Sequence, residues 1–121
     1  MSSYRLERVA NIISVEISKM IYEGKIKDYR VTPLINVTHV EVSKDLAHAK
    51  VWISTLGKKE SLPVAIKGME SAKGFIQAKL GKKLQTRYTP KLVFIADEAV
   101  ERALDIQNKI DMVIASEQSN S

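Results

Sequence analysis

The stretch Glu70–Pro90, ESAKGFIQAKLGKKLQTRYTP, decides the fold because a helical pattern changes direction inside it. One apolar stripe at helical spacing ends near its start and consists of Leu62, Ala65, Ile66, Met69 and Ala72. A second stripe, with a spacing of four, consists of Ile76, Leu80 and Leu84. Both stripes cannot face one core on a straight rod, and small residues permit a sharp turn. We therefore predict a corner between two helices at Ala72, Lys73 and Gly74.

The predicted corner has two interpretations. A turn at this point exposes the first backbone amides of the second helix, around Phe75 and Ile76, and these amides and the helix dipole suit a phosphate group. An ordinary corner that serves packing alone explains the same residues equally well. The local sequence leaves both interpretations open.

Positive charge is concentrated in the same third of the chain. The 121 residues include 19 basic and 14 acidic side chains, with a net charge of +5. The range 58–91 holds nine of the basic residues and two acids, Glu60 and Glu70, which leaves a net charge of −2 for the rest. The nine are Lys58, Lys59, Lys67, Lys73, Lys79, Lys82, Lys83, Arg87 and Lys91. Such a patch attracts a polyanion, although a solvated lysine-rich face has the same composition.

The residues before this region predict a helix followed by a β-hairpin. Apolar residues at helical spacing predict a helix from Ser3 to about Glu23, with Gly24 at its end. After Pro33, the run LINVTHVEVS predicts a strand, and a change in its alternation indicates a bulge. The turn residues 43–46 and the run AHAKVWIS then predict a second strand. Its two faces are Ala47, Ala49, Val51 and Ile53 on the dry side and His48, Lys50, Trp52 and Ser54 on the other.

The remaining elements complete an α+β domain. Ser61 is predicted to cap the first helix of the pair, in which Gly68 costs about 1 kcal/mol relative to alanine. Pro90 ends the basic segment, residues 91–96 predict a short buried strand, and Asp97 caps a last helix. The order helix, strand, strand, kinked helix pair, strand, helix predicts helices on one face of a three-stranded sheet. We expect one domain over residues 1–114 and a polar, disordered tail over residues 115–121.

The sequence offers no catalytic or metal-binding constellation. His39 and His48 flank the hairpin turn, but zinc needs three or four ligands and no HExxH spacing is present. A GxSxG motif, a GxGxxG fingerprint and a GxxxxGKS/T loop are also missing. We therefore expect no enzyme activity, no metal, no cofactor and no small-molecule substrate. Trp52 beside Lys50 is either a stacking platform for a base or a half-buried structural residue, and we favour the second interpretation.

Composition also bounds the cellular location. The sequence has no cysteine, its start MSSYRLERVA lacks the layout of a secretion signal, and no apolar run approaches the ~20 residues of a membrane span. We expect a cytoplasmic monomer with no membrane partner.

Two segments of the chain resemble the bacterial ribosome-binding factor A family. They are VEVSKDLAHAKVWIS, residues 40–54, and SAKGFIQAKLGKKLQTRYTPKLVFIAD, residues 71–97. The connector GKIKDYRV and the long first helix are also similar. Where KH domains carry a GxxG loop, this chain has the AxG of the family at Ala72, Lys73 and Gly74. It departs from the family after Asp97, where Ala99 and Ala103 replace a serine and a glycine.

The resemblance implies a fold and a function. It implies a type II KH-like domain that binds the free or immature 30S subunit at 16S ribosomal RNA, rather than complete 70S ribosomes. It further implies help with late maturation of the 5′ region of the RNA, above all in the cold. The alternatives are a generic single-stranded nucleic-acid-binding module and a protein-interaction adaptor.

A set of RNA-binding residues follows from the charge pattern and the resemblance. We expect phosphate contacts from Lys73, Lys79, Lys82, Lys83 and Arg87. Gly74 would permit close approach of the RNA backbone. Lys58, Lys59 and Lys91 are expected to contribute from further out.

Overall fold

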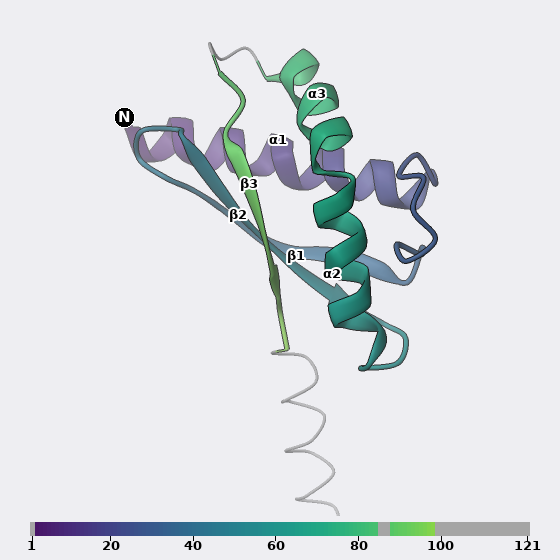
Figure 1. Cartoon of the computed structure of the whole chain (residues 1–121). Coiled ribbons are helices and arrows are strands. Elements are labelled where there is room, and N and C mark those ends of the chain that lie inside the picture. The colour runs from purple at the N-terminus through teal and green to yellow at the C-terminus, as the bar shows by residue number, and fades with distance from the viewer. Residues whose placement is uncertain (1, 85–87, 99–121) are drawn as a thin grey trace, which may run out of the picture.

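The structure, a computed structural model, describes residues 2–84 and 88–98 of the chain. Its elements in chain order are α1 (Ser2–Tyr22), β1 (Ile35–Val42), β2 (His48–Thr55), α2 (Ser61–Ser71), α3 (Lys73–Lys83) and β3 (Lys91–Ala96) (Figure 1). This order confirms the predicted α+β arrangement as far as β3. The predicted last helix and the tail over residues 115–121 lie outside the described residues.

The three strands form one mixed sheet in the order β1–β2–β3. β1 is antiparallel to β2, and β3 is parallel to β2. Parallel neighbours need a long crossover connection, which α2 and α3 provide. In the β1–β2 pairing Val37 lies opposite Ile53 and His39 lies opposite Trp52, so Thr38 is an extra residue. This register shift confirms the predicted bulge.

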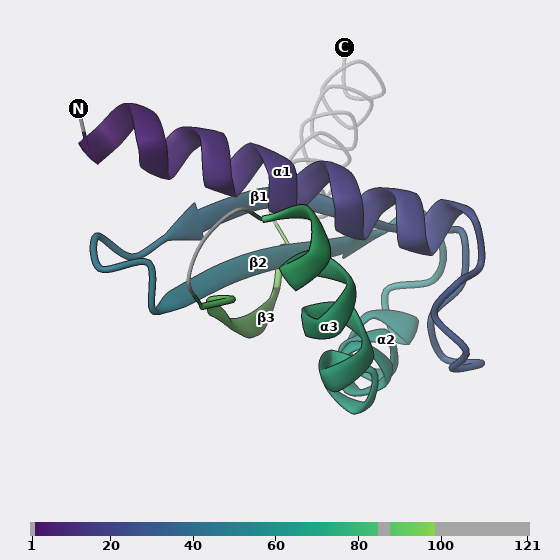
Figure 2. The same ribbon diagram turned by 90° about the horizontal axis from the view of Figure 1, so that it is seen from above.

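The helices cover one face of the sheet. Side chains on that face are buried, namely Ile35, Val40, Val42, Ala49, Val51, Ile53, Leu92 and Phe94. α1 contacts β1, whereas α2 contacts β2 and β3. In Figure 2, which looks down on this layer, α1 passes across β1. The predicted layering of helices on one sheet face is therefore confirmed.

Both predicted helical stripes contribute to the core. Leu62, Ala65 and Met69 of α2 are buried, and so are Ile76 and Leu80 of α3 and Leu84 directly after it. Ile66 and Ala72 are only partly buried at its edge. Burying each of the larger aliphatic side chains contributes roughly 1.5–3 kcal/mol of stability. The predicted corner is present at Ala72, but a change of stripe direction is not its cause. At about 100° per residue, these buried positions of both helices fall within one arc of about 100°.

The end of α1 agrees with the sequence prediction. Gly24 has φ of +67°, a left-handed conformation that glycine adopts without steric cost. The amide of Lys25 donates to the carbonyl of Met20 at 2.9 Å, and the amide of Gly24 donates to the carbonyl of Ile21 at 3.1 Å. These two bonds close the helix and direct the chain into the connector before β1.

The start of α2 differs from the prediction. Ser61 is the first helical residue rather than the cap, and the preceding Glu60 makes no side-chain capping bond. The hydroxyl of Ser61 instead donates to the carbonyl of Lys58 at 2.6 Å. The prediction was wrong because this hydroxyl is used by the preceding turn rather than by the helix amides.

Candidate nucleic-acid interface

The structure places the break between the two helices at Ala72. α2 ends at Ser71 and α3 begins at Lys73, with Ala72 between them at φ −91° and ψ 5°. The amide of Ile76 donates to the carbonyl of Ala72 at 3.0 Å. The amide of Ile76 is therefore occupied inside the protein, and the expectation that it is exposed to a phosphate was wrong. Any anion at this corner has to be held by side chains or by other amides.

Gly68, one turn before the corner, is required by internal packing. A Cβ atom built at Gly68 would lie 2.9 Å from a methyl carbon of Val31, 3.0 Å from Cβ of Arg30 and 3.1 Å from a carboxylate oxygen of Asp28. The α1–β1 connector therefore lies directly on the backbone of α2. The glycine that weakens the helical pattern of the sequence is what allows this approach.

Gly74, the second residue of α3, has no such packing reason. A Cβ atom built there would meet nothing within 4 Å, and the residue is exposed. Of the other four glycines in the chain, Gly24 has positive φ and the rest have a neighbour within 3.1 Å. A glycine in a helix interior costs about 1 kcal/mol relative to alanine, and Gly74, in the first turn, costs up to this amount. Contacts within the described residues do not explain this cost, and the close approach of a binding partner would explain it.

Three lysines form one outward face of α3, which we call the α3 lysine face. Lys79, Lys82 and Lys83 are all exposed. At about 100° per residue, they fall within an arc of about 100°, in which Lys83 borders the buried stripe and Lys79 and Lys82 lie farther from it. None of the salt bridges among the described residues involves any of the three. The ammonium group of Lys79 lies 5.6 Å from the ring centroid of Phe75, which leaves its charge accessible to a ligand.

Lys73 is separate from the α3 lysine face. Its ammonium nitrogen lies 2.6 Å from a carboxylate oxygen of Glu70 and 5.9 Å from the ring centroid of Phe94. Only 32% of its side chain is exposed. Around the helix axis it points about 120° away from Lys79. Lys73 therefore connects the corner to α2 and β3, and most of its charge is balanced by Glu70.

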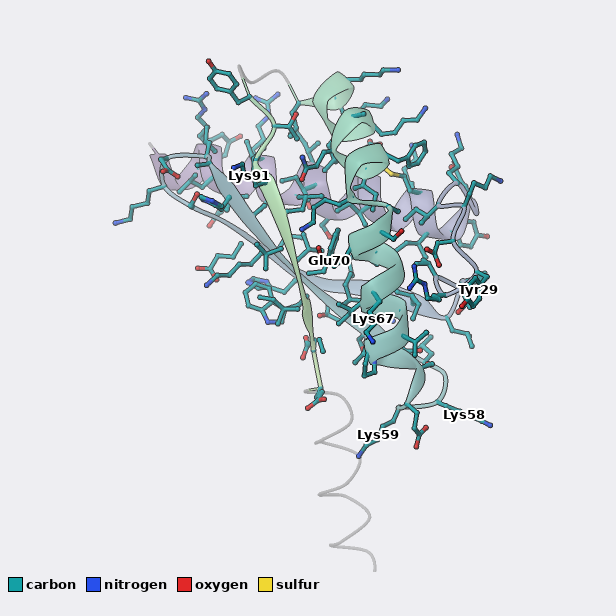
Figure 3. All side chains as sticks on the ribbon, in the orientation of Figure 1. Tyr29, Lys58, Lys59, Lys67, Glu70 and Lys91 are labelled. Carbon is teal, nitrogen blue, oxygen red and sulfur yellow. The ribbon has the colours of Figure 1, made fainter. Side chains whose placement is uncertain are left out.

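The more distant basic residues of the prediction lie away from the α3 lysine face. Lys58 and Lys59 extend from the turn before α2, at the end of that helix farthest from α3, and Lys91 lies at the start of β3 (Figure 3). All three are exposed. Arg87 lies outside the described residues. The structure therefore brings together three of the nine predicted RNA-binding residues. Gly74 lies in the first turn of the same helix and points about 140° away from Lys79 around the axis.

Two further lysines lie beside the corner, and the sequence analysis did not include them in the site. Lys25 and Lys27 of the connector line a cavity of about 250 Å³ together with Asp28, Ser71, Ala72 and Phe75. Both lysines are exposed, and Lys25 also lies 3.4 Å from Glu23. They were not predicted as part of the site because they lie some 45 residues before the corner, outside the basic range 58–91. Their presence in the run GKIK was the available signal.

An internal ion pair fixes the connector that carries these lysines. The guanidinium group of Arg30 donates to both carboxylate oxygens of Asp28, at 2.9 and 2.8 Å, and the amide of Arg30 donates at 3.0 Å. These bonds, the side-chain bond first, lower the pKa of Asp28 to about 2. Ile26 is buried in the core between the two lysines. The connector is therefore held in one shape against α2.

The outer sheet face carries the histidines and the tryptophan. The rings of His39 and Trp52 lie 5.1 Å apart with a tilt of 48°, and Trp52 is half-buried. Within residues 2–84 and 88–98, no three histidine or acidic side chains gather as a metal site would require. The same residues include no helix with the length and apolarity to cross a membrane. The cationic corner is thus the best-defined candidate site.

The fold and this site define a small α+β domain that presents a cationic helix next to a bare backbone corner. Residues 5–110 match the family model described as ribosome-binding factor A. The chain is 42% identical to ribosome-binding factor A of Treponema denticola over 92% of this chain and 84% of the relative. It is 35% identical to the protein of the same name from Gloeobacter violaceus over 100% of this chain and 95% of the relative. The chain therefore belongs to the ribosome-binding factor A family.

Solved structures agree on the fold. The crystal structure of ribosome-binding factor A from Thermus thermophilus aligns with a TM-score of 0.63 and 21% identity, over 75% of this chain and 94% of that one. A second comparison is with a homology model of the Thermus thermophilus protein that was fitted into a cryo-electron microscopy map of its 30S complex. It aligns with a TM-score of 0.52 and 22% identity, over 72% of this chain and 93% of that one. At these identities the likeness concerns the fold alone.

Proposed function

We propose that this protein binds the free or immature 30S subunit at 16S ribosomal RNA and acts as an assembly factor without catalysis. Membership of the ribosome-binding factor A family supports the proposal, as does the 30S complex described for the Thermus thermophilus protein. The observation that carries it is the α3 lysine face, because its exposed lysines make no salt bridge among the described residues. Gly74, in the first turn of the same helix, adds a bare position about 80° from Lys82 around the axis.

The geometry suits a sugar–phosphate chain. Lys79, Lys82 and Lys83 supply ammonium groups on one side of a rod, and Lys25 and Lys27 continue the positive surface at the corner. The missing side chain at Gly74 lets a phosphate group come close to the helix backbone. If roughly four to six phosphates are neutralised, the logarithm of the affinity falls with the logarithm of the salt concentration at a slope of about −3 to −5.

The proposed mechanism is differential binding. A protein that binds one RNA arrangement more tightly than another shifts the population toward it, by as much as the two affinities differ. In this proposal the favoured arrangement is one that allows late maturation of the 5′ region of 16S RNA. The effect is largest in the cold, where misfolded RNA pairings persist longest. No bond is made or broken by the protein, which acts as a cytoplasmic monomer.

Sedimentation of a cell extract tests this proposal. The protein should travel with free small subunits and be depleted from the fraction of complete 70S ribosomes. Raising the salt concentration in the gradient should release it, because the contact is mainly electrostatic. Sedimentation with 70S ribosomes, or near the top of the gradient at low salt, would contradict the proposal.

A competition experiment separates this function from its closest alternatives. Fragments of 16S RNA should displace the labelled protein from small subunits at lower concentration than random RNA of the same length. Equal competition would identify a generic nucleic-acid-binding module. Binding that resists salt and both RNAs would identify a protein-interaction adaptor.

A further inference from the structure

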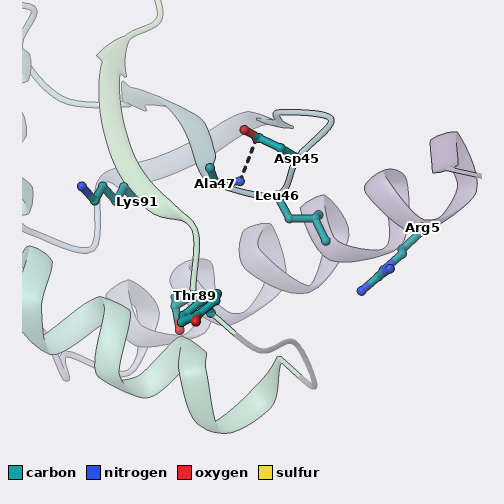
Figure 4. Close-up of a pocket in the computed structure, with 7 residues that line it drawn as sticks. Arg5, Asp45, Leu46, Ala47, Thr89 and Lys91 are labelled. Atoms are coloured by element: carbon teal, nitrogen blue, oxygen red, sulfur yellow. Dashed lines mark hydrogen bonds between the residues drawn. The ribbon is translucent and has the colours of Figure 1, made fainter.

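A second cleft lies between the first turns of α1, the β1–β2 turn and the segment that leads into β3 (Figure 4). Its volume is about 480 Å³, within the range of pockets that bind small ligands. The residues that line it are Arg5, Asp45, Leu46, Ala47, Tyr88, Thr89 and Lys91. The cleft shares none of them with the cavity at the corner.

The lining combines apolar surface with positive charge. Leu46, Ala47 and the ring of Tyr88, which is 70% exposed, provide the apolar part. Arg5 and Lys91 lie on opposite sides of the cleft in Figure 4. The lining of the cleft therefore includes an aromatic ring and two cations.

The acid in the lining is already engaged by the turn. The carboxylate of Asp45 accepts a hydrogen bond from the Ser43 hydroxyl at 2.7 Å and one from the Ala47 amide at 3.0 Å. These bonds lower the pKa of Asp45, so it stays ionised while it caps the turn amide. Its charge is directed to the turn (Figure 4). With one acid and two cations, the cleft is positive on balance.

The cleft is preformed by backbone contacts. The amide of Leu46 donates to the carbonyl of Ser43 at 2.9 Å, and Leu46 has φ of 60°. The amide of Lys91 donates to the carbonyl of Ala47 at 2.9 Å, which joins the turn to β3. A ligand that enters therefore does not have to order these two walls.

The cleft begins where α3 ends. A Cβ atom built at Gly81 would lie 2.9 Å from the hydroxyl oxygen of Thr89, so the cleft wall touches the last turn of the helix. Lys82 and Lys83 are the next residues of that turn. Around the helix axis, Gly81 lies about 160° from Lys79 and from Lys83, and Lys82 lies between them. A strand on the α3 lysine face therefore reaches the cleft by crossing the last turn of α3 over Lys82.

From these observations we infer that the cleft binds one unpaired nucleotide of the RNA strand that lies on the α3 lysine face. The base stacks against Tyr88 and contacts Leu46, while its two flanking phosphates are bound by Arg5 and Lys91. A nucleotide within a strand has a phosphate on each side, which matches one cation on each side of the cleft. The inference rests on the proposed function and adds to it a position at which a single base is held.

Binding of short RNAs to the full chain tests the inference. The probes are a ten-nucleotide single-stranded RNA, the same sequence in a duplex, and the free nucleotides AMP and UMP. Replacing Tyr88→Ala should weaken binding of the single strand by roughly 5- to 100-fold, because stacking on an aromatic ring is lost. Tyr88→Phe keeps the ring and should bind as the native protein does. The duplex should bind without sensitivity to Tyr88.

Charge and position are tested by a matched pair of variants. Arg5→Glu should weaken binding of the single strand. Lys19→Glu also replaces a positive charge by a negative one, but in the last turn of α1, and it should have a smaller effect. Nuclear magnetic resonance should show shifts of the Leu46, Ala47 and Thr89 amides with the single strand and much smaller ones with AMP or UMP.

The outcomes separate this inference from the proposed function. Three results would each overturn the inference. Tyr88→Ala could bind the single strand as tightly as native protein does, the cleft amides could show no shifts, or AMP or UMP could bind the cleft as tightly as the strand does. The proposed function would stand in those cases, provided that binding still depends on the α3 lysine face. If native protein bound none of the RNAs, the proposed function itself would be contradicted.

Discussion

Gly68 and Gly74 lie on either side of the same corner, yet their surroundings differ. At Gly68 the backbone of α2 is in contact with the connector, and a methyl group would meet three neighbours at 2.9–3.1 Å. At Gly74 the backbone of α3 faces open space. The first glycine is accounted for by the packing of the fold, and the second is not.

The comparison separates the fold-forming side of the helix pair from its outward side. The α2 side is defined by contacts within the chain, including the Asp28–Arg30 ion pair that lies against Gly68. The α3 side presents three lysines without salt bridges among the described residues. A partner with regularly spaced negative charges fits the second side, and Lys25 and Lys27 of the connector extend the positive surface at the corner.

The largest effect is expected from charge reversal on the outward side. The triple variant Lys79→Glu, Lys82→Glu, Lys83→Glu should bind small subunits at least about 100-fold more weakly, because three attractive contacts become repulsive. Its free energy of unfolding should stay within about 1 kcal/mol of the native value, because the three side chains are exposed. Co-sedimentation with purified 30S subunits measures the binding, and urea unfolding measures the stability.

A charge-matched control makes this result specific. Lys19, Lys44 and Lys50 are exposed on other elements, and their replacement by glutamate changes the net charge by the same amount. This control should keep most of its affinity. If both triple variants bind equally well, the α3 lysine face is not the contact.

The second prediction concerns the fold-forming side. Gly68→Ala should lower the free energy of unfolding by about 1–3 kcal/mol, because the added methyl group pushes the connector away from α2. Urea denaturation measures this change. An unchanged or raised stability would show that the connector adapts without strain and that the contrast between the two glycines is weaker than the geometry indicates.

The sequence predicted the fold well where the signal was local. The corner at Ala72, the bulge in β1 and the end of α1 at Gly24 were predicted from short-range patterns, and the structure has each of them. Gly68 was read as a weak point of the helix because its partners, residues 28–31, lie some 40 positions earlier in the chain. Such a long-range contact leaves no mark on the helical pattern itself.

The candidate site was predicted in part. The periodicity of α3 separates Lys79 and Lys82 from the buried stripe and puts Lys83 at its edge, and the structure shows all three exposed. Lys73 was grouped with them, although its position three residues after Glu70 is typical of a helical ion pair. Lys25 and Lys27 could not be assigned to the corner without the path of the connector.

A smaller effect is expected at Gly74, where replacement by alanine should raise stability but weaken binding. Gly74→Ala should raise the free energy of unfolding by about 0.5–1 kcal/mol, because alanine is the better helix former and has room. The same variant should weaken binding to small subunits by roughly three- to tenfold, because the methyl group holds the RNA backbone away. Ala78→Gly, at another exposed position of α3, serves as the control and should change stability alone.

The smallest effect is expected from the ion pair in the connector. The pKa of Asp28 is lowered from 3.8 to about 2 in the folded protein, chiefly by its bonds to Arg30. The stability that this group contributes is therefore complete above pH 4 and is lost as the pH falls from about 4 toward 2. Asp28→Asn should be less stable than the native protein at pH 7, and this difference should shrink at pH 2–3. Thermal unfolding across this pH range measures it, and a difference that does not depend on pH would contradict the assignment.

The salt dependence of binding to purified 30S subunits tests the central claim most directly, because it counts the phosphate contacts that the protein makes. Native protein should show a slope of log affinity against log salt of about −3 to −5. The variant Lys79→Gln, Lys82→Gln, Lys83→Gln should give a slope shallower by about 2 to 3, since each lost contact removes roughly 0.7 to 0.9. Equal slopes for the two proteins would contradict the claim that α3 lies along the ribosomal RNA backbone.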